Sequence, residues 1–367
     1  MSVPTRTQRT DAAPSRPLFS DETSGIKPGR ITRVQHVGIL VGSVGAAAAL
    51  LLAFGVLGPF SLFMVGALLY LLTVYVSARA VEGRRHATNR LVTGVVTTFF
   101  LLALSPLLSV IATVVARGVA RFDPMFFTYS MRGILGEGGG AYHAIMGTLI
   151  ITGITTLLSV PIGILAAIYL VEYGNRGRLA RALTFFVDVM TGIPSIVAGL
   201  FAVALFTLFL GPGVRMGIIG SVALMVLMIP VVVRSTEEML RLVPNELREA
   251  AYALGVPKWL TVSKVVLPTA AAGIGTGVTL AIARVIGETA PLLVTVGTTT
   301  GFNLNPFEGR MQTLPVFAYY SYATPGIPRE AFLERMWAAV LTLMLIVMTL
   351  NIIARLISKY FAPKTGR

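Results

Sequence analysis

The sequence predicts an all-α protein, a polytopic bundle of membrane-spanning helices. Hydrophobic residues make up 55% of the 367 residues and charged residues only 13%, whereas soluble domains carry about 25% charged residues. The apolar residues also gather into about eight segments, each near the roughly 20 residues that a helix needs to cross a bilayer. We expect spans at residues 36–57, 60–78, 91–115, 145–171, 183–210, 215–233, 266–290 and 337–357.

Basic residues predict the orientation of these spans, because cytoplasmic loops carry an excess of Lys and Arg. With the N-terminus inside, the most basic loops (79–90, 176–181 and 234–264) and the basic C-terminal tail all lie in the cytoplasm. Both termini are then cytoplasmic. The net charge of +14 is explained by this topology and by anionic lipid headgroups, so we expect a lipid bilayer and no nucleic acid as partner.

The chain divides into three predicted parts. Residues 1–35 form a polar, disordered cytoplasmic tail, residues 36–90 form two N-terminal helices with a basic loop, and residues 91–367 form a core with a cytoplasmic loop at 234–264. The chain has no cysteine, and its three histidines are far apart. We therefore expect no disulfide and no metal site.

The cytoplasmic loop contains a short predicted helix over residues 245–255. Asn245 is a good N-cap, and Glu246 places a negative charge at the positive end of the helix. Gly255 suits the left-handed position after the last helical residue, and Pro257 prevents continuation. A helix this short needs a surface to pack on.

The face of this helix distinguishes two interpretations. Glu246, Arg248 and Glu249 are expected to point away from the centre of an apolar and mostly small face. The helix either lies on its own membrane domain or docks on a separate cytoplasmic protein, and small Ala residues favour docking because they allow a close approach. The face consists of Leu247, Ala250, Ala251 and Leu254.

The seventh apolar segment carries the polar groups that a solute pathway requires. Arg284 and Glu288 are four residues apart, which places them on one face of a helix, with Thr289 beside them. An Arg at the centre of a span costs roughly 2.5–3.5 kcal/mol, so it normally faces a cavity or a partner. The guanidinium suits a tetrahedral oxyanion, and Glu288 would hold it in place. Alternatively, the two form a structural ion pair near the outer interface.

The fifth segment has a second polar cluster, formed by Asp188, Thr191, Gly192, Pro194 and Ser195. Proline leaves a backbone carbonyl without its helical partner, and broken helices in transporters expose such groups to a substrate cavity. We expect Pro194 and Ser195 to border the pathway. The alternative is an ordinary proline kink.

The chain carries no motif for hydrolysing ATP. A phosphate-binding Gly-x-x-x-x-Gly-Lys-Ser/Thr loop is absent, as are a catalytic triad and paired carboxylates in an apolar setting. We therefore expect no catalytic residue, no cofactor bound by this chain and no enzymatic activity of its own.

The cytoplasmic loop resembles the "EAA" coupling loop of ABC-importer permeases. The resemblance rests on Glu249-Ala250-Ala251, Gly255 and Leu267-Pro268, with Val265 where that family usually has Ile. From about Met125 onward, the sequence is more specifically similar to the PstA branch, the phosphate-transporter permeases. The matching stretches are residues 168–174, 194–201, 248–255, 281–284 and 287–293.

This resemblance implies a type I ABC importer permease fold in the bacterial inner membrane, with six family helices and two extra N-terminal ones. It implies that the chain forms half of a phosphate pathway together with a PstC-like permease, two PstB-like ATPases that hold ATP and Mg, and a PstS-like binding protein. Arg284 and Glu288 match polar positions of the family. The implied ATPase-coupling residues are Glu249, Ala250, Ala251, Leu254 and Gly255.

Two other functions remain open from the sequence. The same architecture could serve another oxyanion, such as sulfate or molybdate. An ion-driven secondary carrier, or a membrane scaffold without a substrate, would belong to a different class. A secondary carrier usually shows internal repeats and needs no short docking helix.

Overall fold

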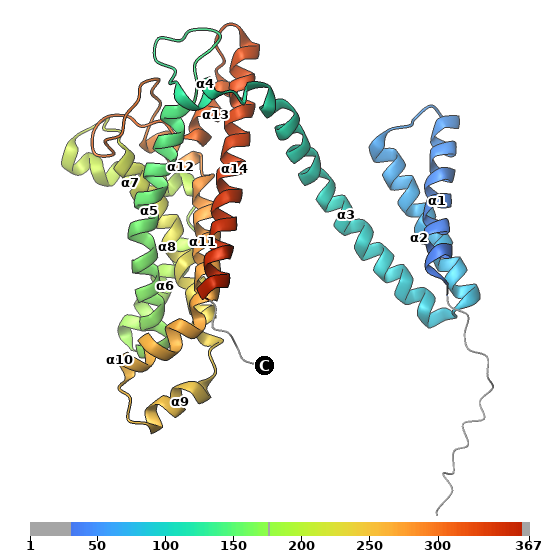
Figure 1. Cartoon of the computed structure of the whole chain (residues 1–367), viewed down its shortest axis with the longest axis horizontal. Coiled ribbons are helices and arrows are strands. Elements are labelled where there is room, and N and C mark those ends of the chain that lie inside the picture. The colour runs from blue at the N-terminus through green and yellow to red at the C-terminus, as the bar shows by residue number, and fades with distance from the viewer. Residues whose placement is uncertain (1–30, 175–176, 362–367) are drawn as a thin grey trace, which may run out of the picture. The chain divides into compact units, whose positions relative to one another are not determined.

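The computed structural model describes residues 31–174 and 177–361, and these residues form helices joined by loops, without a strand (Figure 1). The predicted all-α class is confirmed. Most of the predicted tail, residues 1–30, lies outside the described residues, and residues 33–35 already belong to the first helix. The chain separates into two compact units, Met1–Leu108 and Ser109–Arg367.

The first unit contains α1 (Arg33–Ala53), α2 (Pro59–Val81) and the first part of α3 (Arg84–Gly118). Small and hydroxyl residues bring α1 and α2 together, and Ser43 Oγ lies 2.9 Å from Thr73 Oγ1. After α2, the Glu82 carboxylate accepts hydrogen bonds from Arg90 Nε at 2.6 Å and Nη2 at 2.7 Å. These hydrogen bonds lower the pKa of Glu82 below its ordinary value of 4.5.

The second unit is a larger bundle. Two of its short turns are π-helical: η2 continues α5, and η3 leads into α11. Its elements are η1 (Val119–Arg121), α4 (Pro124–Thr128), α5 (Tyr142–Ile168), η2 (Tyr169–Tyr173), α6 (Arg178–Thr191), α7 (Ser195–Leu210), α8 (Gly217–Arg241), α9 (Asn245–Ala253), α10 (Lys258–Thr261), η3 (Val262–Val266), α11 (Leu267–Ile286), α12 (Ala290–Thr295), α13 (Leu314–Ala323) and α14 (Arg329–Phe361).

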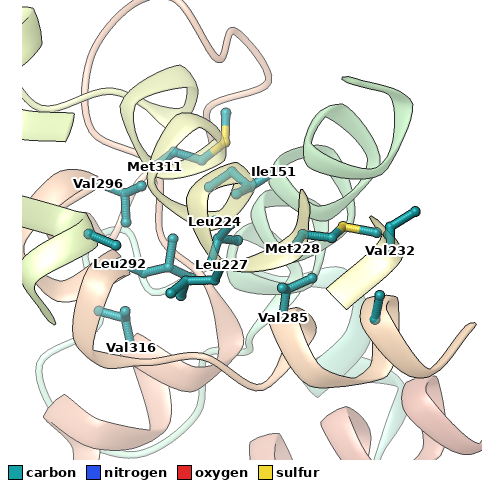
Figure 2. Close-up of a cluster of buried hydrophobic side chains, with 12 residues drawn as sticks. Ile151, Leu224, Leu227, Met228, Val232, Val285, Leu292, Val296, Met311 and Val316 are labelled. Atoms are coloured by element: carbon teal, nitrogen blue, oxygen red, sulfur yellow. The ribbon is translucent and has the colours of Figure 1, made fainter. Parts of the chain in front are cut away.

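Helix α8 is the central element of this bundle. It packs against α5, α6, α7, α11 and α12, and 61% of its most apolar window is buried, compared with 28% for α5 and for α14. Leu224 and Met228 of α8 meet Ile151, Val285 and Leu292 from three neighbouring helices (Figure 2). The helices around α8 therefore share one core.

The fifth predicted span is not a single helix. The structure has seven helices that are long and apolar enough to cross a membrane, among the residues described, and α6 with α7 makes an eighth only if this bent pair counts as one span. The two helices meet at 113°, because Pro194 cannot continue α6 and instead caps α7. The expectation of one span over 183–210 is corrected to a broken helix pair.

The two ends of the second unit carry different elements. The short helices α9 and α10 lie at one end, whereas α4 and the loop after α12 lie at the other (Figure 1). Helix α7 and the short helix α12 lie in the half of the bundle away from α9. The short helix α9 and the region of α7 and α12 therefore occupy separate parts of one bundle.

Candidate functional site

The short helix in the cytoplasmic loop forms as α9, with an end that follows the prediction. Gly255 has φ +75°, and Val256 N donates to Ala251 O at 3.1 Å, which closes the helix with a left-handed glycine. The start differs, because Pro244 is the N-cap and Asn245 is the first helical residue. The predicted N-cap role of Asn245 is wrong. Its Oδ1 instead accepts a hydrogen bond from Arg248 at 3.2 Å.

Most of the predicted coupling residues are on the free surface of α9. Glu249, Ala250 and Gly255 are exposed, and Leu254 has 83% of its surface accessible. Ala251 differs, since it is buried with 8% exposure and packs within the chain. An exposed apolar side chain beside small residues is the composition of a docking surface. The structure therefore offers four of the five residues to a partner.

Arg248 does not point away from its own domain, which corrects the expectation from the sequence. Its Nε and Nη2 donate to Glu172 Oε1 at 3.1 and 2.8 Å. The same guanidinium donates to Leu240 O at 2.9 Å and Val243 O at 2.7 Å. The last carbonyls of a helix lack intrahelical partners, and the five donors of Arg satisfy several of them at once. Arg248 thus fastens α9 to the ends of α5 and α8.

A second group of residues surrounds two helix breaks. The first break separates α6 from α7 at residues 192–194, and the second separates α11 from α12 at residues 287–289. The two short second halves pack together, because a Cβ on Gly199 of α7 would lie 2.8 Å from Pro291 Cα of α12. Broken helices with adjacent ends expose backbone polar groups, as they do at the binding sites of transporters.

The predicted pathway residues lie at these two breaks. Pro194 is exposed and caps α7, and Ser195 is its half-buried first residue. Arg284 is exposed in the last turn of α11, whereas Glu288 and Thr289 are half-buried in the second break. The sequence therefore selected residues that the fold brings into the same region of the bundle.

The expected ion pair between Arg284 and Glu288 does not form. Helix α11 ends at Ile286 with Gly287 as its cap, so Glu288 is not on the same helical face. The salt bridges among the described residues include none between these two side chains. The i, i+4 rule applies only where the helix continues. Arg284 consequently presents its guanidinium without a carboxylate partner in the described structure.

Asp188, in the predicted polar cluster, is already engaged. Its carboxylate forms a salt bridge with Arg234 of α8, and Arg234 also binds Glu237 at 2.9 Å. This network ties α6 to α8 just before the first break. Asp188 therefore has a positioning contact, while Pro194 and Ser195 remain at the break itself.

Glu172 was missed in the sequence. It is the single acidic residue between Tyr142 and Tyr173, and an isolated carboxylate at the end of a long apolar segment predicts a buried partner. Its partner is distant in the chain, so the sequence signal identifies the position but not the contact.

Comparison with known proteins places these features in context. Residues 159–367 match the family described as "Binding-protein-dependent transport system inner membrane component". The chain is 48% identical over 287 residues to "Phosphate transport system permease protein PstA 1" of Mycobacterium tuberculosis, a match covering 77% of this chain and 91% of that relative. It is 37% identical over 293 residues to the PstA protein of Yersinia pestis, covering 80% and 96%.

Solved structures give a more distant likeness. The methionine ABC transporter MetNI, in an inward-facing conformation, is 20% identical and matches with a TM-score of 0.48, covering 61% of this chain and 95% of that chain.

Proposed function

Because this chain belongs to the PstA family of binding-protein-dependent transport permeases, we propose that it is the membrane permease subunit of an ATP-driven importer of inorganic phosphate. This proposal rests on the 48% identity to the phosphate transport permease PstA 1 of Mycobacterium tuberculosis, in a match that covers 91% of that relative. A permease subunit of an ABC transporter is a transport component in the inner membrane of a bacterium. The family thus argues against an ion-driven secondary carrier, while a different oxyanion remains the competing substrate.

The partners follow from this role. A binding-protein-dependent transporter implies an ATPase and a binding protein. We propose a PstC-like second permease, two PstB-like ATPases that hold ATP and Mg, and a PstS-like binding protein, with both termini of this chain in the cytoplasm. The exposed surface of α9, including Glu249 and Leu254, supports docking of an ATPase.

Energy reaches the membrane helices through α9 in this proposal. When ATP closes the ATPase dimer, α9 moves with its docking partner, and the Arg248–Glu172 contact transmits that motion to α5 and α8. Helix α8 packs directly on α7, α11 and α12. Motion of this core would then open and close the region of the two helix breaks, in alternation between outward and inward access.

The solute contact in this proposal is Arg284. Its guanidinium is exposed and lacks a carboxylate partner in the described part of the chain, which leaves its planar set of donors free for an oxyanion. Thr289, Pro194 and Ser195 contribute polar groups from the adjacent breaks. The attraction must stay weak, because conduction requires that a bound ion also leaves.

The test is uptake of radiolabelled phosphate in cells whose only copy carries Arg284→Ala. We expect normal assembly, shown by pull-down of the ATPase, and loss of uptake. Arg178→Ala is the matched control, since Arg178 is also exposed but lies at the start of α6. Normal uptake by Arg284→Ala would remove this arginine from the pathway. If the parent chain takes up sulfate or molybdate but not phosphate, the proposal that phosphate is the substrate is refuted.

A further inference from the structure

Arg335 is a buried cation in the half of the bundle away from α9. It lies in α14 with 1% of its surface exposed. Its Nη1 donates to Gly136 O and Gly138 O, both at 2.8 Å. Within the described residues, Nε and Nη2 have no hydrogen-bond partner, and no carboxylate pairs with this guanidinium.

An unpaired buried charge calls for a counter-ion. Charged side chains are almost never fully buried unless they are paired, because an uncompensated buried charge is strongly unfavourable. Two carbonyl oxygens and the ring of Phe332, whose centroid lies 4.3 Å from Arg335 Cζ, compensate part of the guanidinium charge, but none of them carries a full negative charge. Of the neighbouring charges that act on Arg335, Arg121 pairs with Asp123, and Glu334 forms no salt bridge with Arg335. The charge that favours an anion here is therefore that of Arg335 itself.

A cavity of about 150 Å³, lined by both apolar and polar side chains, adjoins Arg335. One water needs about 10–15 Å³ of such space, so the cavity has room for a small polyatomic ion. His143 lines it with 2% exposure, and its Nδ1 has no hydrogen-bond partner in the described structure. The two buried groups, His143 and Arg335, belong to different helices, α5 and α14. The fold brings them to one cavity.

Neutral donors complete the lining. The hydroxyls of Thr298, Thr300 and Ser321 line the cavity and make no hydrogen bond among the described residues. Gln312 also lines it, and its Oε1 is occupied by Thr299 N at 2.8 Å, which leaves its amide NH₂ to donate. No Asp or Glu lines the cavity. Met131, Phe317 and Phe332 form an apolar part of the wall, while the fixed cation, the hydroxyls and the amide supply donors of the kind that bind an oxyanion.

We propose that this cavity is an oxyanion-binding site, distinct from the helix breaks, where Arg335 and His143 hold the anion before it reaches Arg284. The ligand class follows from the donors, whereas the choice of phosphate rests on the proposed function. The site lies opposite α9, on the side where a binding protein would deliver its solute. The competing role for Arg335 is purely structural, as a clamp on the Gly136–Gly138 carbonyls.

The test measures binding of radiolabelled inorganic phosphate by equilibrium dialysis. It uses the assembled membrane complex in lipid nanodiscs without the binding protein. Arg335→Gln removes the cation, and Ser321→Val fills the cavity and leaves Arg335 in place. Arg329→Gln is the matched control, because Arg329 lies exposed at the start of the same helix.

We expect Arg335→Gln and Ser321→Val to weaken phosphate binding at least about tenfold, and Arg329→Gln to retain it. If Ser321→Val binds as the parent does, the cavity is not the site, whatever Arg335→Gln does. Phosphate uptake without Arg335-dependent binding would overturn this inference and leave the proposed function intact. Arg335-dependent binding of sulfate in a complex that transports no phosphate would support the site and overturn the proposed substrate.

Discussion

Glu172 Oε1 accepts hydrogen bonds from both Nε and Nη2 of Arg248, at 3.1 and 2.8 Å. The two side chains are nearly buried, with 5% and 13% of their surfaces exposed. They join η2, at the end of α5, to α9, across 76 residues of sequence. Helix α9 is thus held to the bundle by a short, polar and specific contact.

Removing this contact should destabilise the chain and uncouple transport. We expect Arg248→Gln to cost about 3 kcal/mol, because it leaves the Glu172 carboxylate buried without its partner. The midpoint of thermal unfolding of the purified complex, and the phosphate moved per ATP hydrolysed, should both fall. Glu246→Gln is the control, since Glu246 is exposed on the same helix. If Arg248→Gln and Glu246→Gln have the same thermal midpoint and move the same amount of phosphate per ATP, a coupling role for Arg248 is contradicted.

The exposed end of α9 should carry ATPase affinity without contributing to folding. Leu254→Asp places a charge on a side chain with 83% exposure, so we expect little change in stability and at least tenfold weaker association with the ATPase. Leu135→Asp, at a residue 88% exposed in the loop before α5, should leave association unchanged. Pull-down of the ATPase from membranes measures both. Unchanged association with Leu254→Asp would exclude this face as the docking surface.

The contact between the two broken helices should tolerate no side chain at Gly199. A Cβ there would lie 2.8 Å from Pro291 Cα and 2.9 Å from Pro291 O, and backbone cannot yield as a side chain does. Overpacking of this kind costs about 1–3 kcal/mol, so Gly199→Ala should lower the thermal midpoint and phosphate uptake. Gly192→Ala is the matched control, since its nearest contact would be 3.5 Å. A thermal midpoint equal to that of the control would show that α7 and α12 are less tightly packed.

Arg284 and Glu288 should act independently. Helix α11 ends between them, so Glu288→Gln should not reproduce the loss of uptake expected for Arg284→Ala. The free-energy changes of two substitutions at residues without a shared contact usually add to within about 0.3–0.5 kcal/mol. A double-mutant cycle on initial uptake rates, with Arg284→Lys to retain measurable transport, provides the measurement. A coupling energy above this range would mean that Arg284 and Glu288 form an ion pair during the transport cycle.

The first unit should weaken in acid through Glu82. Arg90 hydrogen bonds lower the folded pKa of Glu82 below 4.5, so its stabilising contribution is complete above the unfolded pKa. It is lost as the pH falls through the lower folded pKa. The difference in thermal midpoint between the parent and Glu82→Gln should therefore be largest at about pH 7 and shrink below about pH 4.5. A difference that grows in acid would reverse the assigned sign.

The sequence predicted the apolar helices well, because length and composition decide whether a segment can span a bilayer. It also predicted the end of α9, since Gly255 followed by Pro257 is a local signal. The 113° turn between α6 and α7 was not predictable. Pro194 indicates where a helix is interrupted, but the angle depends on packing against α8 and α12.

The candidate site residues also divide into those that a local sequence signal predicts and those that depend on contacts with distant parts of the chain. Arg284 was selected because charged residues are unusual in apolar segments, and Pro194 because polar residues cluster around it. The inward turn of Arg248 and the burial of Arg335 were missed, because their partners, Glu172 and Gly136, are distant in the chain. Periodicity gives the face of a helix, whereas a long side chain can reach around that face to a neighbour.

Changes in membrane thickness should act unevenly on this bundle. Helices that contact lipid adjust to a thinner or thicker bilayer by tilting, whereas α8 has 61% of its apolar window covered by its own chain. Helix α8 ends at Arg241, and α9 begins at Asn245. Helix α9 is therefore connected directly to the span that is best shielded from acyl chains. Its height above the membrane should depend little on lipid composition, even where the outer helices tilt.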